Sequence, residues 1–186
     1  MPDERVHVAM RELISAFSCL DRAGLTDRLA RAAATVARAA YAGFVRCDPL
    51  REEAHAVHTH GPPGDPLRMR AWLAESGVLK ELAAADGPLC LARDVSVGAP
   101  GFLATPVPLT TCDHVSLWVA GRAFDTADEH LLGRFATAAG RALEAAGDLE
   151  AATRLLRGVQ AFTPPRRPRV PVRPQQRIRP PATGPD

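Results

Sequence analysis

The sequence of 186 residues contains no asparagine, one lysine and one tyrosine, and its few cysteines are far apart. The cysteines are Cys19, Cys47, Cys90 and Cys112. They form no CxxC pair and lack the spacing of a disulfide framework, which excludes a disulfide-rich secreted domain. We interpret them as reduced thiols, and we expect Cys90, which lies between two leucines, to be buried in a strand and unreactive.

Long apolar segments are also missing. No hydrophobic run approaches the roughly 18 residues that a membrane-spanning helix needs. The N-terminus begins with acidic residues, and no apolar segment of a secretory signal follows them. The sequence therefore predicts a cytoplasmic protein with no membrane association.

Charge is unevenly distributed along the chain. Residues 163–186 contain six arginines, one acid and eight prolines, whereas residues 1–162 contain 17 basic and 20 acidic residues. The composition of 163–186 predicts a disordered basic tail, because it offers too little apolar surface to offset the entropy of ordering. We expect no nucleic-acid binding except through this tail, which has no aromatic residue on which bases could stack.

The hydrophobic pattern predicts an α+β fold, in which helices flank a mainly antiparallel sheet. The expected helices cover residues 8–18, 25–40, two pieces of 67–85 broken near Gly77, and a long C-terminal helix from 126 to about 162. The expected strands cover 41–47 and 54–60, 88–92, and 102–109 and 114–120, with both pairs forming hairpins. Either Asp125 with Asp128 or Thr126 with Glu129 can form the capping box of the long helix.

The sequence contains no constellation typical of catalysis. No serine lies in a nucleophile elbow, and no glycine-rich phosphate loop precedes a helix. The only histidine cluster is in 54–60, where His58 and His60 share a strand face and His55 is expected to point the other way. Two imidazoles do not complete a zinc site. We therefore expect no catalytic residues, no metal and no enzymatic activity.

Three segments carry a resemblance to a known family. They are 102–109 (FLATPVPL), 115–120 (VSLWVA) and 123–129 (AFDTADE), the last of which opens the long helix. The chain resembles the GAF domain family over about 9–147, and is most similar to GAF domains of actinobacterial sensor kinases and of GAF-ANTAR antiterminators. It is shortened, since only 93–101 connect two strands where typical members have a longer loop that roofs the ligand pocket.

The resemblance implies a non-catalytic regulatory module that binds a small ligand, a signalling protein partner or both. The large apolar residues at family pocket positions, together with one histidine, are Phe44, His58, Met69, Trp72, Phe102 and Trp118. A pocket based on the sheet face of Phe44 and Trp118 would suit a mostly apolar or weakly anionic ligand. The alternatives are that these residues only form the core of a degenerate GAF adaptor without a ligand, or that the protein acts on nucleic acid through its tail.

The resemblance also implies that several ligands of the family are absent. There is no histidine between His60 and His114, from which haem-binding members supply an iron ligand. The asparagine-containing motif of cyclic-nucleotide binding cannot exist here, and the cysteine pattern of the methionine sulfoxide reductases is not reproduced. We expect no cofactor.

A heptad pattern in the long helix predicts a homodimer. The seam runs from Leu131 through Phe135, Ala138, Ala142 and Ala145 to Leu149, Ala152, Leu156 and Val159. Its first half must also pack on the sheet, so the expected dimer interface is Leu149, Ala152, Leu156 and Val159. The predicted organisation is a GAF-like domain over 1–147, a coiled-coil extension over 148–162 and the tail over 163–186.

Overall fold

A computed structural model describes residues 22–48, 50–111 and 114–162. Its elements are α2 (Arg22–Val36), β1 (Tyr41–Asp48), β2 (Glu53–His60), α3 (Met69–Glu75), α4 (Val78–Ala84), β3 (Leu89–Asp94), β4 (Ala99–Val107), β5 (His114–Ala120) and α5 (Thr126–Phe162). The helix expected at 8–18 lies outside the described residues. In the part of the chain that is described, no helix is long and apolar enough to cross a membrane.

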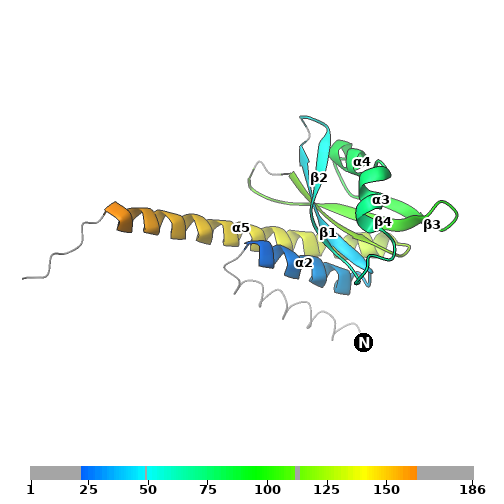
Figure 1. Cartoon of the computed structure of the whole chain (residues 1–186), viewed down its shortest axis with the longest axis horizontal. Coiled ribbons are helices and arrows are strands. Elements are labelled where there is room, and N and C mark those ends of the chain that lie inside the picture. Colours follow the sequence, from blue (N-terminus) through cyan, green and yellow to red (C-terminus); the bar gives the residue numbers. More distant parts are fainter. Residues whose placement is uncertain (1–21, 49, 112–113, 163–186) are drawn as a thin grey trace, which may run out of the picture.

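The five strands form one antiparallel sheet in the order β2-β1-β5-β4-β3. Helices α2 and α5 cover one face, and the short helices α3 and α4 cover the other (Figure 1). This arrangement confirms the predicted α+β fold and both predicted hairpins. A left-handed residue, Gly77 with φ of 81°, separates α3 from α4 where the break was expected.

The expected loop over 93–101 is largely absent, because β3 and β4 extend into it and form a third hairpin. Only residues 95–98 connect the two strands. Asp94 Oδ1 accepts hydrogen bonds from the backbone N (2.9 Å) and the hydroxyl (2.6 Å) of Ser96, which closes the turn. Val95 and Val97 at its tip are 77% and 76% exposed.

Local hydrogen bonds determine where α2 ends and where α5 begins. Helix α2 ends at Val36, four residues before the expected end, because Arg38 adopts φ of 50° and Ala39 N donates to Ala34 O (2.9 Å), as in a Schellman motif. At the start of α5, Asp125 Oδ1 accepts from Asp128 N (2.9 Å) and Asp128 Oδ2 accepts from Asp125 N (3.2 Å). The structure thus selects Asp125 with Asp128 as the capping box.

Helix α5 is continuous over 37 residues, through the glycine at 147. Three of its side chains packed on the sheet and α2 are alanines, which lets the helix lie close to the strands. The packed side chains are Leu132, Phe135, Ala136, Ala139, Ala142 and Leu143. A Cβ at Gly140 would collide with the carbonyl oxygen of Pro108. Beyond this packed part, α5 projects past the sheet (Figure 1).

Candidate functional site

Three aromatic side chains fill the space between the sheet and α3. The ring centroids of Phe102 and Trp118 are 5.7 Å apart, and those of Trp72 and Phe102 are 5.5 Å apart. Phe102 and Trp118 are fully buried, and Met69 and Leu73 of α3 belong to the same cluster. The aromatic rings thus occupy the space between sheet and helix in which the sequence predicted a ligand.

The indole of Trp118 lies flat over Gly43. Gly43 is paired with Trp118 across β1 and β5, and a Cβ on it would be 2.6 Å from Trp118 Cζ2 and would also collide with His58 O. Only glycine leaves room for the ring at this position. Trp118 Nε1 is buried and has no hydrogen-bond partner among the described residues, an arrangement that is uncommon for a buried donor.

The six predicted pocket residues do not share a face of the sheet. Met69, Trp72, Phe102 and Trp118 lie together beneath α3 and α4, whereas Phe44 belongs to the core beneath α2 and α5. Phe44 is paired with Leu117, the neighbour of Trp118 in β5, and successive residues of a strand point to opposite faces. The expectation that Phe44 and Trp118 form one pocket floor is therefore wrong.

His58 is paired with Phe44 and also faces α2. Its Nε2 atom is buried and lies 3.3 Å from Asp27 Oδ1, but the two are not aligned as a hydrogen bond. Asp27 also forms an ion pair with Arg31 one turn further along α2, at 2.9 Å. His58 thus links the edge strand β2 to α2 rather than to the aromatic cluster.

A β-bulge changes the histidine pattern. Between Phe44 and Val45 the pairing skips one residue of β2, so Phe44 pairs with His58 and Arg46 pairs with His55. Both histidines therefore lie on one face, and the expectation that His55 points away from His58 is wrong. Among the described residues, no group of three histidine, cysteine or carboxylate side chains could hold a metal ion.

The loop before α3 is organised by a buried tyrosine that the sequence analysis did not single out. Tyr41 is 1% exposed, and its hydroxyl accepts a hydrogen bond from Leu67 N at 3.0 Å. Asp65 accepts from Met69 N at 2.8 Å and so caps α3. Burial raises the pKa of Tyr41, and the bond from Met69 lowers the pKa of Asp65. The two groups fix the position of α3 over the sheet.

A groove of about 340 Å³ opens at the edge of the sheet between β2 and α3. Its lining residues are Ala56, Val57, His58, Thr59, Arg70 and Leu73. Leu73 is shared with the aromatic cluster, and Thr59 is paired with Gly43, beneath Trp118. The groove therefore adjoins the buried indole.

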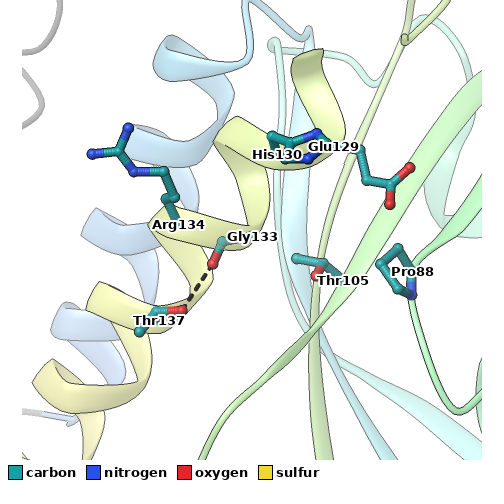
Figure 2. Close-up of a pocket in the computed structure, with 7 residues that line it drawn as sticks. All are labelled: Pro88, Thr105, Glu129, His130, Gly133, Arg134 and Thr137. Atoms are coloured by element: carbon teal, nitrogen blue, oxygen red, sulfur yellow. Dashed lines mark hydrogen bonds between the residues drawn. The ribbon is translucent and has the colours of Figure 1, made fainter. Parts of the chain in front are cut away.

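A second groove, of about 350 Å³, lies on the opposite face, between α5 and strand β4 (Figure 2). Its lining residues are Pro88, Thr105, Glu129, His130, Gly133, Arg134 and Thr137. In Figure 2 the carboxylate of Glu129 extends toward Pro88, whereas Arg134 extends away from the strands. A Cβ on Gly133 would have no neighbour within 4 Å, so the missing side chain helps to keep the groove open.

Two thiols lie near these sites, and neither is activated. Cys90 is exposed, contrary to the expectation of a buried side chain, because Leu89 and Leu91 take the inward positions of β3. Partial burial and the carboxylates of Glu129 and Asp128 raise the pKa of Cys90. Burial also raises the pKa of Cys47. A raised pKa disfavours the thiolate that nucleophilic chemistry needs.

The predicted dimer residues lie beyond the part of α5 that packs on the sheet. Leu149 is 47% exposed, and Ala152 is exposed. The side chains of Leu156 and Val159 lie outside those that the structure describes, although the helix continues through both positions. Leu155, which flanks the seam, is 72% exposed.

Comparison with known proteins identifies the fold. No family model and no curated protein matches the sequence. Among solved structures, the GAF domain of a putative sensor histidine kinase from Pseudomonas syringae pv. tomato is similar, with a TM-score of 0.51 and 18% identity over 86% of this chain and 96% of that one. The chain has a GAF-like fold. The GAF domain of an Acinetobacter phosphoenolpyruvate-protein phosphotransferase is similar too, with a TM-score of 0.52 and 12% identity over 80% and 97%.

The GAF-like fold also occurs in an enzyme. A free methionine-R-sulfoxide reductase from Neisseria meningitidis, in complex with its substrate, has a TM-score of 0.54 and 16% identity over 79% of this chain and 92% of that one. At such identities the likeness establishes the GAF-like fold, while the actinobacterial kinship stays a prediction. The fold is shared by proteins of different function, so function has to be argued from the sites.

Proposed function

We propose that this GAF-like chain is a non-catalytic regulatory module that acts as a homodimer through the distal half of α5 and there engages a signalling partner. The observation that carries the proposal is the exposure of apolar side chains on the part of α5 that extends beyond the sheet. Leu149 and Leu155 are 47% and 72% exposed, beyond the last side chains that pack on the sheet. A single helix without a packed face is marginal in water, so a second copy would stabilise it.

The aromatic cluster supports an adaptor more than a sensor. Three of the side chains expected to line a ligand cavity, Trp72, Phe102 and Trp118, instead pack on one another. Trp118 and Phe102 are both at 0% exposure. The raised pKa values of Cys47 and Cys90 support a non-catalytic role. In this proposal the domain is a rigid platform and α5 carries the interaction.

Hydrogen exchange of the distal helix tests the proposal. We expect the amides of 148–158 to be protected at high protein concentration and to lose protection on dilution, because the dimer dissociates and the helix frays. The amides of 132–143, which pack on the sheet, serve as an internal control and should keep their protection. Distal amides that exchange at one rate at all concentrations would contradict the proposal.

A second candidate function, ligand sensing, is favoured by one observation. The buried indole N–H of Trp118 has no acceptor among the described residues, and the groove of Thr59 and Leu73 adjoins it. A small, mostly apolar ligand with a carbonyl or carboxylate would supply the acceptor and regain the hydrogen bond. Arg70 at the groove suits a weakly anionic ligand.

A thermal-shift screen of small carboxylic acids tests the sensor candidate. A ligand that binds only the folded protein adds about 2.7 kcal/mol of stability at a hundredfold excess over its Kd. We expect Trp118→Phe, which removes only the indole donor and part of the ring, to abolish the shift, and Trp72→Phe to retain it. A screen without any hit favours the adaptor.

A further inference from the structure

The groove between α5 and β4 is rich in hydrogen-bond acceptors. Glu129 is half-buried, and its carboxylate makes no ion pair or side-chain hydrogen bond with any residue that the structure describes. Thr137 donates its hydroxyl proton to Gly133 O at 3.0 Å, which leaves its oxygen as an acceptor. A half-buried carboxylate in a groove that also offers a hydroxyl acceptor favours a ligand with several N–H donors and a positive charge.

His130 adds a third acceptor at the rim. Its Nδ1 atom lies 2.7 Å from the carbonyl oxygen of Thr126, which can only accept, so Nδ1 carries the proton. In this tautomer the Nε2 atom has no proton and is an acceptor. The one cation among the lining residues, Arg134, extends away from the strands in Figure 2 and leaves the charge of Glu129 uncompensated.

We propose that this groove binds a guanidinium group, and that Arg177 or Arg179 of the same chain supplies it. Guanidinium is planar and can donate two parallel hydrogen bonds to one carboxylate, here that of Glu129. Residues 163–186 carry six arginines and one acid. Their positive charge is opposite to that of the Glu129 carboxylate, which favours docking of this segment in the groove. The proposal is independent of dimerisation.

Chain length selects the arginines that can reach the groove. Phe162, the last residue of α5, is 33 residues from Glu129, which is about 50 Å along a helix that rises 1.5 Å per residue. An extended chain spans about 3.3 Å per residue. The backbone therefore reaches about 36 Å at Arg173 and about 50 Å at Arg177. Arg166 and Arg167 are too close to the helix end to reach Glu129.

Amide NMR of the full chain tests this assignment. We compare the resonances of Gly133 and Thr137 in the unaltered protein, in R177Q/R179Q and in the matched control R166Q/R167Q. We expect the first variant alone to shift these resonances, and 0.5 M salt to produce the same shift in the unaltered protein, because the contact is ionic. Glu129→Gln removes the charge of the groove. With an unaltered tail, it should move the same resonances to the positions seen in R177Q/R179Q.

Filling the groove with a side chain provides a second test. Gly133→Leu places a side chain in the groove and should make the Thr137 resonance the same with the unaltered tail and with R177Q/R179Q. Gly147→Leu, also in open space on α5, should leave the difference between these two resonances unchanged. In R177Q/R179Q, added N-acetyl-arginine amide should restore the original resonances, with affinity at least about tenfold lower after Glu129→Gln. Equal shifts in the two arginine variants, or none, would overturn the assignment of the tail. If the probe also fails to bind, the guanidinium site itself is overturned.

Discussion

Arg122 and Asp128 form a two-point ion pair, with Nη1 2.8 Å from Oδ2 and Nη2 2.5 Å from Oδ1. The same guanidinium donates from Nε (2.9 Å) and Nη2 (2.6 Å) to the carbonyl oxygen of Ala37 and stacks on Phe124, 4.4 Å from the ring centroid. Ala37 follows the end of α2, and Asp128 is in the first turn of α5. One arginine therefore joins the two helices that cover this face of the sheet.

Neutralising Asp128 should destabilise the protein in a pH-dependent way. The hydrogen bonds from Arg122 lower the pKa of Asp128 in the folded state. Its stabilising contribution is therefore complete above the unfolded value of about 3.9 and is lost as the pH falls through the lower folded value. We expect Asp128→Asn to reduce the free energy of unfolding by about 1–3 kcal/mol at pH 7 and by much less at pH 3.

Urea denaturation at the two pH values measures this difference. Asp148→Asn, at an exposed position of the same helix, is the matched control and should change stability little at either pH. A loss on Asp128→Asn that is the same at pH 3 and pH 7 would show that the charge of the pair is not what stabilises the junction.

Gly43 should tolerate no side chain. A Cβ there would be 2.6 Å from Trp118 Cζ2, within a core that cannot expand, so Gly43→Ala should cost about 1–3 kcal/mol or more. Gly87→Ala, at a position with nothing within 4 Å, should be close to neutral. Denaturation followed by tryptophan fluorescence measures both. Equal stability of the two variants would mean that the indole does not lie on Gly43.

The fold was largely predictable because its signals are local. The turn after Asp48, the break at Gly77 and the acidic cap at Asp125 all act within a few residues, and each was placed close to its observed position. The β3–β4 hairpin was not predicted, because glycine and proline in 93–101 are also typical of a loop. The turn depends instead on bonds from Ser96 to Asp94.

The candidate site was less predictable, because its geometry depends on pairing between strands. Residues 41–45 are buried on both faces, so their sequence contains no alternation that could assign Phe44 to one face. The bulge in β2 reverses the side of His55, and nothing in the alternation of 54–60 reveals it. The groove over Gly133 depends on an absent side chain next to a strand distant in sequence.

Cys90 should react slowly despite its exposure. Burial, then Glu129 and Asp128, raise its pKa, so little thiolate exists near neutral pH. Glu129→Gln removes one repulsive charge, lowers the pKa and should raise the rate of alkylation by iodoacetamide a few-fold at pH 7.5. Mass spectrometry of the peptide that contains Cys90 follows the reaction, and Glu150→Gln is the control. A rate unaffected by Glu129→Gln would contradict the electrostatic account.

Removing one hydroxyl should loosen the loop before α3. Tyr41→Phe deletes the acceptor of the Leu67 amide but keeps the buried ring, so we expect a loss of about 1 kcal/mol. The amide of Leu67 should exchange faster with solvent, while amides of β5 keep their rates relative to global stability. Unchanged exchange at Leu67 would show that the hydroxyl does not hold this loop.

The mass of the full chain in solution tests the central claim most directly. At tens of micromolar, light scattering should give twice the 19.8 kDa of one chain. Leu149→Asp with Leu156→Asp should reduce this to the monomer mass, because charges in the seam oppose pairing, whereas Ala151→Asp outside the seam should leave a dimer. A monomer for the unaltered chain, or a dimer that survives both leucine substitutions, would contradict the account.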